Sequence, residues 1–531
     1  MSTTTTAGTG NSAWAPFRIP VFRALWIATL ASNIGTWMHD IGAGWLMTSL
    51  SPSPVMVALV QTATTLPVFL LALPAGALAD IIDRRRYLIV TQVYMAVVAA
   101  SLTVVAITGV VTPWLLVGLT FAMGLGTALM LPAWAAIVPE LVPRSALPSA
   151  IALNSMGINV ARAIGPAIAG VIVSMAGSGA VFALNALSFV GVIMVLLWWK
   201  RTPQISELPA ERVVGAMRAG LRFARHSAEL QAAAVRGLGF FLFASASWAL
   251  LPLVARQIPG GGPQAFGVLV ASVGVGATLG ALVLPRLREK LSRDVLVLGA
   301  TGLYALCLWA LATLSGLWQL AAVMAVSGTA WITVLSSLQV AAQMALPNWV
   351  RSRGLAVFMA VFMGSMAVGS LCWGKLAELY SIDFSLTAAA VGTALAAVLT
   401  WRWKIGGAET LDLAPSMHWP SPPAVDRQDR GPVLVTIEYQ VRVDSVSEFQ
   451  ALIRQLGKQR RRDGAFAWSV FEDADRAHCY IEAFNDESWL AHLRQHERVT
   501  VETREMQTRI KACLEAGSEP VVRHYLGSAS S

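Results

Sequence analysis

The chain has 531 residues, of which 56% are hydrophobic and only 13% are charged, and its formal net charge is +9. A soluble globular protein carries roughly 25% charged residues, so most of this chain is not expected to be an ordinary soluble domain. The charged residues concentrate after residue 431, which indicates a membrane domain followed by a soluble one. The basic excess of the apolar part then belongs to cytoplasmic loops, and no nucleic-acid partner is expected. The four cysteines are scattered without a CxxC spacing, so no disulfide framework is expected.

The first residues are rich in Thr, Ser and Gly and lack the basic, then apolar pattern of a cleaved signal peptide. The first apolar run is therefore expected to remain in the membrane. A hydrocarbon core of ~30 Å needs about 20 apolar residues in a helix. Twelve such runs occur, near residues 22–45, 55–79, 87–109, 113–138, 148–175, 179–199, 236–256, 264–285, 295–314, 316–345, 353–377 and 384–403.

Lysine and arginine distinguish the two sides of the predicted membrane domain. Alternate loops carry these residues in groups: Arg84, Arg85 and Arg86; Arg144; Lys200, Arg201, Arg212, Arg218, Arg222 and Arg225; Arg286, Arg288, Lys290 and Arg293; Arg351 and Arg353. Of the intervening loops, only the one near 256–263 contains a basic residue, Arg256. Because cytoplasmic loops are the basic ones, both termini of a multi-pass protein of the bacterial inner (plasma) membrane are expected in the cytoplasm.

The loop at 200–235 is longer than the others. Its stretch Glu211–His226 predicts a helix with an apolar stripe made of Val214, Met217, Leu221 and Ala224. Such a helix can lie on the inner leaflet of the membrane. A solvated connector between two halves explains the stretch equally well, and both alternatives stay open.

The apolar part of the chain repeats itself. The segment 76–80 resembles the segment 280–284, and the same offset relates three further pairs: Pro143 with Pro347, Gly165 with Gly369, and Gly170 with Gly374. One constant offset in several regions indicates two halves of six helices each, in parallel orientation. Transporters with such repeats bind their substrate between the halves, near the bilayer midplane.

The segment between the second and third runs reads GALADIIDRRR and begins at Gly76. It resembles the signature cytoplasmic loop of the major facilitator superfamily. The resemblance implies that Asp80 and the following arginines form a charge network that holds the inward face closed. Small residues such as Gly76 would let helices approach closely.

The loop departs from the family pattern at two positions, where Ile81 replaces an Arg and Asp83 replaces a Gly. Arg84 and either Arg85 or Arg86 are therefore expected to supply the cation. For Arg86 the simpler reading is that it follows the positive-inside rule. The second-half copy has Leu284 in place of the acid, so only the first half is expected to close in this way.

The fifth run contains Gly165, Pro166 and Gly170. This spacing resembles the Gly-Pro motif in the fifth helix of exporters of the same superfamily. These residues permit a kink and close helix packing. Gly and Pro are common in membrane helices in general, but the placement of the Gly-Pro pair favours an exporter.

The whole arrangement, including the segments 139–144 and 150–155, resembles the branch that contains enterobactin exporters, macrolide efflux proteins and transmembrane secretion effectors. This resemblance implies a secondary active transporter that exports a small amphiphilic molecule, either a drug, a siderophore or a secreted metabolite. Alternating access driven by proton antiport is the expected mechanism. Import is the alternative direction. No Walker-type GxxxxGK[ST] loop occurs, so ATP is not expected to be the direct energy source.

Three ionisable residues lie deep in the predicted helices: His39 and Asp40 in the first run, and Arg162 in the fifth. Such residues are costly in a membrane and are usually functional. Asp40 and Arg162 can reach a similar depth and pair, either as a proton-coupling site or as a static ion pair. His39 either shuttles the proton or covers the cavity. An amphiphilic substrate would suit a cavity lined by Asn33, Trp37, Trp45, Asn154 and Asn159.

The tail predicts a small α+β domain after a Pro-rich linker. A strand at 433–443 precedes a helix with a capping box of Ser445 and Glu448 and an apolar stripe of Phe449, Leu452, Ile453 and Leu456. Strands near 465–472 and 477–484, helical stretches over 487–513 and a strand at 520–526 complete the order βαββαβ. This order indicates a ferredoxin-like sandwich.

The tail resembles the antibiotic-biosynthesis-monooxygenase-like fold, whose members often dimerise, so this domain is expected to dimerise or to sense a cytoplasmic ligand. His492 and His496 are one helical turn apart and could chelate a metal, but no third ligand is evident, so a solvated or partner-facing pair is favoured. Neither a metal nor a cofactor is expected. The run Arg460–Arg462 is expected to be a solvated helix end. Fold alone does not confer activity; the alternative function is a membrane-tethered enzyme or ligand sensor.

The predicted fold is an all-α membrane protein with twelve transmembrane helices in two parallel-repeat six-helix halves, followed by a C-terminal α+β ferredoxin-like domain. The predicted boundaries are 1–199 for the N-terminal half, 200–235 for the cytoplasmic inter-half loop, 236–403 for the C-terminal half, 404–431 for the linker and 432–531 for the soluble domain. The chain is not expected to be an enzyme.

Overall fold

A computed structural model describes residues 14–201, 213–347, 349–407, 413, 416, 419 and 430–527. The chain divides into two compact units. The first contains most of the apolar helices. The second contains the C-terminal domain together with 214–233 and 340–357. Most of the predicted linker at 404–431, and Glu211 at the start of the predicted inter-half helix, lie outside the described residues.

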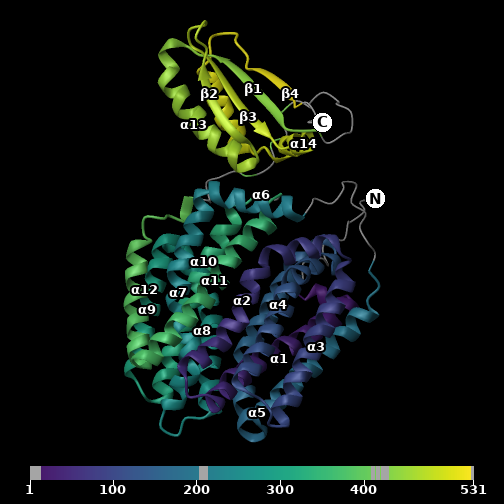
Figure 1. Ribbon diagram of the computed structural model, residues 1–531, viewed down its shortest axis with the longest axis vertical. Helices are drawn as coiled ribbons and strands as arrows, with labels where there is room; N and C mark the ends of the chain where they lie inside the picture. The colour runs from purple at the N-terminus through teal and green to yellow at the C-terminus, as the bar shows by residue number, and fades with distance from the viewer. Residues whose placement is uncertain are drawn as a thin grey trace, which may run out of the picture. The chain divides into compact units, whose positions relative to one another are not determined.

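The helices of the first unit follow the predicted apolar runs closely, and Figure 1 shows α1–α5 beside α7–α12. The first group consists of η1 (Ala15–Arg18), α1 (Pro20–Leu50), α2 (Pro54–Ile81), α3 (Arg84–Ile107), α4 (Pro113–Leu141), η2 (Arg144–Ala146) and α5 (Leu147–Trp198). The second group consists of α7 (Ala228–Gln257), α8 (Pro263–Lys290), α9 (Arg293–Thr313), α10 (Leu317–Met344), α11 (Arg351–Leu379) and α12 (Ile382–Leu399). Proline begins α1, α2, α4 and α8, where its missing N–H leaves no helical hydrogen bond unmade.

Helix α5 joins two of the predicted apolar runs. Its 52 residues would extend ~78 Å at 1.5 Å per residue, more than twice the hydrocarbon thickness of a bilayer. The helix is interrupted at Gly177, whose φ of 77° and ψ of 172° lie in a region that only glycine adopts readily. The bend therefore gives α5 two arms, each long enough for one span.

Among the described residues, ten helices are long and apolar enough to cross a membrane. Helix α5 counts once in this number. Helix α1, which carries His39 and Asp40, does not count among them. This abundance of apolar helices agrees with the membrane domain that the composition predicts.

The predicted inter-half helix is present as α6 (Val213–His226), within the second unit. Leu221 of the predicted apolar stripe is exposed, whereas Phe223 is fully buried. The ring of Phe223 packs edge-on against Trp349 at 5.9 Å, and the guanidinium of Arg462 lies 5.5 Å from its centroid. The helix thus buries a side chain outside the stripe that the sequence singled out.

The C-terminal domain is a four-stranded antiparallel sheet with the strand order β2-β3-β1-β4. Its elements are β1 (Val433–Gln440), η4 (Val443–Ser445), α13 (Val446–Asp463), β2 (Phe466–Glu472), β3 (Cys479–Asp486), α14 (Trp489–Arg498), α15 (Val501–Ala512) and β4 (Val521–Leu526). The predicted order βαββαβ is confirmed, with the second helical stretch divided into α14 and α15. Figure 1 shows α13 along one side of the sheet.

The core of this domain lies between the sheet and its helices. Alternate residues of β1 are buried, beginning with Val433 and Val435, as a strand with one covered face requires. The predicted apolar stripe of α13 is confirmed, since Phe449, Leu452, Ile453 and Leu456 are all buried in this core. Ser445 is the N-cap residue, but its hydroxyl donates to Asp444 Oδ1 (3.0 Å) instead of capping, so the predicted capping box does not form.

The expectation that Arg460–Arg462 is a solvated helix end is wrong. Arg460 and Arg462 are only 3% and 7% exposed. Arg460 Nε donates to Glu482 Oε1 at 3.3 Å, and the same carboxylate accepts from Tyr439 (2.9 Å) and Trp468 (2.9 Å). Burial, and then the charge of Glu482, raise the pKa of Tyr439 well above its usual range. A buried carboxylate with three donors therefore holds the helix on the sheet.

Replacing Glu482 with Gln is expected to destabilise the C-terminal domain by ~3–5 kcal/mol, because it leaves the Arg460 charge buried without its counter-ion. Amide hydrogen exchange of β3 in the full-length protein measures the loss. Glu438→Gln is the matched control, since Glu438 lies on the opposite face of the sheet and pairs with the exposed Arg476 and Arg523. Equal protection of β3 in the two variants would contradict the expected role of Glu482.

Candidate functional site

A cavity of about 130 Å³ lies between the two groups of helices in the first unit. Helices α1 and α2 form one side, and α7 and α8 form the other. Its lining consists of Trp37, Asp40, Ile41, Gly44, Val57, Val60, Gln61, Thr64, Trp248, Ala249, Leu251, Pro252, Phe266 and Val270. Asp40 is the one charged residue in this lining, and the rest is largely apolar and aromatic.

The helical period explains which part of α1 meets the cavity. Trp37, Asp40, Ile41 and Gly44 are spaced three or four residues apart and share one face of the helix. His39 lies on another face: its ring packs 4.9 Å from that of Phe182 in α5. His39 is buried, and neither ring nitrogen has a hydrogen-bond partner among the described residues. Adjacent ionisable residues therefore face different surroundings.

The structure does not bring Asp40 and Arg162 together as an ion pair. Within the described part of the chain, no basic nitrogen lies within 4 Å of the Asp40 carboxylate. Arg162 places its guanidinium 5.7 Å from the ring centroid of Trp37, and its buried Nε has no hydrogen-bond partner. In this conformation Trp37 lies next to both charged residues, because it also lines the cavity beside Asp40.

Aromatic rings connect the two groups of helices across the cavity. The ring of Trp37 on α1 lies 6.3 Å from that of Trp248 on α7, and Trp248 lies 5.5 Å from Trp331 on α10. Trp331 in turn contacts Phe240 and Phe241. Such rings offer faces for apolar groups and for cations.

Of the predicted cavity residues, Trp37 lines the cavity, and Trp45 stacks on the lining residue Phe266 at 6.5 Å. Asn33, Asn154 and Asn159 are not part of this lining, and Asn159 Nδ2 instead donates to the Ser155 carbonyl at 3.0 Å. Sequence reasoning missed Gln61 and Thr64 on α2. Their polarity within an apolar run was the available signal, since α2 contains few such residues.

Helices α5 and α8 make main-chain contact, which we call the α5–α8 seam and define by Arg162, Pro166, Gly170, Gly267 and Gly274. A Cβ atom on Gly267 would lie 2.6 Å from the Pro166 carbonyl oxygen, and one on Gly274 would lie 2.7 Å from that of Arg162. A Cβ on Gly170 would lie 2.8 Å from the Pro263 carbonyl oxygen. Glycine is therefore required on both sides of the seam for the helices to approach this closely.

Gly165 of the predicted exporter motif has a different partner. A Cβ there would lie 2.7 Å from the Cβ of Trp37 on α1. Pro166, inside α5, is buried. The three motif residues thus place α5 against α1 on one side and against α8 on the other.

The predicted gating loop takes part in a network of ion pairs between charged side chains. The sequence predicted its arginines but not their partner Glu140 or the cation Arg201. Arg201 donates to Glu140 from Nε (2.6 Å) and Nη2 (2.9 Å), and from Nη1 to Asp83 Oδ2 (2.7 Å). Arg84 donates to Glu140 Oε1 at 2.9 Å. Arg85 donates to the carbonyls at the end of α5, those of Leu196 and Leu197 (2.7 Å each). These contacts join the start of α3 to the ends of α4 and α5.

Asp83 has a defined role although it departs from the family pattern. It caps α3 by accepting from the Arg86 amide at 2.9 Å. Burial alone would raise the pKa of Asp83, but the hydrogen bonds from Arg86 and Arg201 outweigh it and lower that pKa. The side chain of Asp80 lies outside the described set. A Cβ on Gly76 would meet no described atom within 4 Å, so close packing is not seen there.

Known proteins resemble large parts of this chain. A staphyloferrin A transporter of Staphylococcus aureus is 26% identical over 260 residues, which cover 48% of this chain and 64% of that protein, less than two thirds of its length. An enterobactin exporter of Escherichia coli is 26% identical over 385 residues, which cover 72% of this chain and 91% of the exporter. The crystal structure of an auto-inhibited POT family peptide transporter has a TM-score of 0.59 at 14% identity, covering 76% of this chain and 99% of that one.

The structural likeness, at this level of identity, concerns the fold alone. The family described as transmembrane secretion effectors matches residues 11–531, nearly the whole chain. The family and the relatives named above are transporters rather than enzymes. This chain therefore belongs to the transmembrane secretion effector family of major facilitator transporters.

Proposed function

We propose that this protein is a secondary active transporter that exports a small amphiphilic molecule by alternating access, coupled to proton entry. The main support for this proposal is the cavity between the two helix groups. Its walls are aromatic, and its lining contains a single carboxylate, that of Asp40. A carboxylate can bind and release a proton without any other cofactor. Aromatic walls suit a molecule with extended apolar parts.

Close helix contacts support an arrangement of twelve spans in two related halves, 1–199 and 236–403. Gly165 of α5 packs on α1, and its repeat mate Gly369 of α11 packs on Leu242 of α7. Gly170 of α5 packs on α8, and its mate Gly374 of α11 packs on Ala58 of α2. Each half thus presents its fifth helix to its own first helix and to the second helix of the other half, which is what a parallel repeat requires.

Contacts between the halves favour an inward-facing conformation. The α5–α8 seam lies in the parts of both helices away from the basic loops. The Thr62 hydroxyl of α2 donates to the Ala367 carbonyl of α11 at 3.2 Å, and Arg256 donates to the Thr48 carbonyl, also at this end. With the basic loops and both termini in the cytoplasm, the closed end is the outer one. The cavity is smaller than the ~300–1,000 Å³ of typical ligand pockets, so substrate entry requires it to widen.

Siderophores are the first substrate class to test, because two of the similar proteins carry a siderophore in their names. Drugs and secreted metabolites of amphiphilic character come next, since the lining offers few polar groups to select one structure. Export rather than import is supported by the placement of Gly165 and Pro166 in α5.

The C-terminal domain, with the boundaries 432–531 and the ferredoxin-like order of strands, is proposed to dimerise. Leu434, Phe471, Val521 and Tyr525 are exposed apolar residues of its sheet. On β1, Leu434 lies between the buried residues Val433 and Val435, so its side chain lies on the opposite, open face of the sheet. A ligand-sensing role of the same domain is the second candidate function.

The test is substrate accumulation in cells that lack their main efflux pumps, with a panel of siderophores, macrolides and dyes. Cells with the wild-type protein are expected to accumulate less of at least one compound than cells with the empty vector. A protonophore is expected to abolish the difference. A chain ending near residue 410 shows whether transport needs the C-terminal domain.

Everted membrane vesicles give the complementary result, because their cytoplasmic face is outside. Adding the exported compound is expected to dissipate an imposed pH gradient only in vesicles with the wild-type protein. Export that persists with the protonophore, or uptake in place of extrusion, would overturn the proposed coupling or direction.

A further inference from the structure

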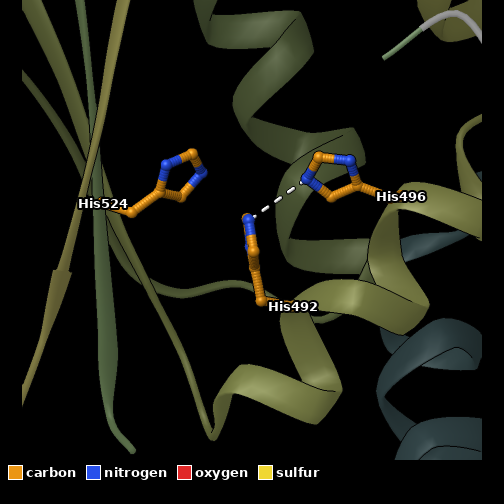
Figure 2. A group of neighbouring side chains, drawn as sticks. All are labelled: His492, His496 and His524. Carbon is orange, nitrogen blue, oxygen red and sulfur yellow. Dashed lines mark hydrogen bonds between the residues drawn. The ribbon is translucent and has the colours of Figure 1, made fainter. Parts of the chain in front are cut away.

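Three histidines meet on one side of the C-terminal sheet (Figure 2). His492 and His496 come from α14, and His524 comes from β4. Their ligand atoms all lie within 4.8 Å of one another, and the Nε2 atoms of His492 and His496 are 3.1 Å apart. Figure 2 shows the His492 ring between the other two, with all three rings directed to a common space.

Local structure explains why these residues converge. A spacing of four residues places His492 and His496 one turn apart on the same side of α14. In the sheet, Val435 of β1 pairs with Phe484 of β3 on one side and with His524 of β4 on the other. Residues in such a row share a face, so His524 lies on the face that carries the buried Phe484.

Asp486 fixes the orientation of the central ring. Its Oδ2 lies 2.8 Å from His492 Nδ1, and both side chains are almost completely buried. When Nδ1–H donates to this carboxylate, the lone pair of a neutral imidazole is on Nε2, the atom that faces the other histidines. Histidines that bind metals are oriented in this way by a carboxylate on the second nitrogen.

Two of the three rings are partly exposed. His496 and His524 are only partly buried, whereas His492 is 2% exposed. Trp489 packs against the rings of His492 (5.4 Å) and His524 (5.8 Å), and Trp419 packs against the ring of His496 (4.9 Å). The arrangement therefore combines one rigid central ligand with two ligands that a solute can reach.

We propose that His492, His496 and His524 form a binding site for a divalent transition-metal ion of the zinc type. Tetrahedral zinc with Zn–N bonds of about 2.0–2.1 Å holds its ligand nitrogens ~3.3 Å apart, close to the 3.1 Å between His492 and His496. The ligand nitrogen of His524 lies within 4.8 Å of the other two, so the three nitrogens must draw closer together when an ion binds. Three imidazoles without a thiolate suit borderline ions such as Zn²⁺, Co²⁺, Ni²⁺ and Cu²⁺. A fourth position is left for water.

This site goes beyond the proposed transport function, because it needs neither the cavity nor a gradient. The test uses the full-length protein in detergent, purified with a tag that contains no histidine. Equilibrium dialysis against Zn²⁺ and metal analysis are expected to give one ion per chain. His492→Gln and His524→Gln are expected to lose this ion. Asp486→Asn is expected to weaken binding ~10–100-fold, as changes in such partners do.

His478→Asn is the matched control, since His478 lies in the turn before β3 and its positive φ is one that Asn tolerates. It should bind Zn²⁺ like the wild type. Co²⁺ gives a second measurement: tetrahedral coordination produces intense visible absorption, which the wild type and His478→Asn should show and His524→Gln should lack. The elution volume in size-exclusion chromatography and the unfolding temperature, both measured without metal, show whether each variant is folded.

Two results would overturn the site. One is a wild-type protein that binds no more Zn²⁺ than the His492→Gln, His524→Gln double variant. In that case the contact between His492 and His496 is only a hydrogen bond between the two rings. The other is an equal loss of Zn²⁺ in His478→Asn, which would show nonspecific binding to histidine.

Discussion

Asp40→Asn is expected to abolish gradient-driven export, reducing it to the level of cells with an empty vector. Asn has nearly the same size as Asp and keeps hydrogen-bonding groups in the lining, but it cannot bind and release a proton. Because Asp40 is the one charged residue of the cavity lining, no other lining group can replace it. Downhill exchange of substrate across vesicles is expected to remain, since the cavity and its aromatic walls are unchanged.

Two variants sharpen this prediction. Thr64→Val removes a polar group from the same lining without changing any charge, and it should keep protonophore-sensitive export. Asp40→Glu restores the carboxyl group and should recover part of the coupling. Normal export by Asp40→Asn that still depends on the gradient would show that the carboxylate is structural. Loss of downhill exchange as well would indicate that the variant has lost its fold or its substrate site.

Gly267→Val is expected to prevent closure of the outer end and to stop transport. Its Cβ would lie 2.6 Å from the Pro166 carbonyl oxygen, and main chain on both sides of the α5–α8 seam cannot move aside as a flexible side chain could. Overpacking of this kind costs ~1–3 kcal/mol, which shifts a two-state equilibrium ~5–150-fold. The ratio of the outward-open to the inward-open population should rise by that factor.

A cysteine in the cavity reports the shift. Gln61→Cys, in a protein whose native cysteines are replaced, should react faster with a membrane-impermeant maleimide from outside when Gly267→Val is added. Gly302→Val in α9 is the matched control, because a Cβ there meets no described atom within 4 Å. Unchanged labelling in Gly267→Val would show that the α5–α8 seam does not control the outer end.

Sequence patterns predicted the elements well, because both membrane helices and strands are governed by local periodicity. The apolar runs match helices α1–α5 and α7–α12, and the alternation after Val433 matches β1. The sequence predicts two separate runs at 148–175 and 179–199, and the structure joins them into α5 with a bend at Gly177, because a single glycine can bend a helix without ending it.

Residues whose role depends on distant partners were harder to predict. Helix α15 separates His524 on β4 from His492 on α14, and the register of β4 on β1 places His524 on the face of the sheet where the histidines meet. Arg460 lies in a basic run that is typical of a solvated helix end, but a carboxylate from β3 reaches it in the core. Arg201 follows α5, and its partners are Asp83 at the start of α3 and Glu140 in the last turn of α4. None of these pairings has a sequence spacing that marks it.

The α5–α8 seam also bears on the speed of the cycle. At Gly267, Gly274 and Gly170 the helices meet through main chain, which is already rigid in both helices. When the two helices separate here, few side chains gain or lose rotamers. The conformational entropy therefore changes little at these positions. The energy of the contact comes from dispersion between the closely packed backbones and from the release of lipid that would otherwise cover them. If the halves separate at this contact during transport, as proposed, we expect the contact to break and re-form with a low barrier.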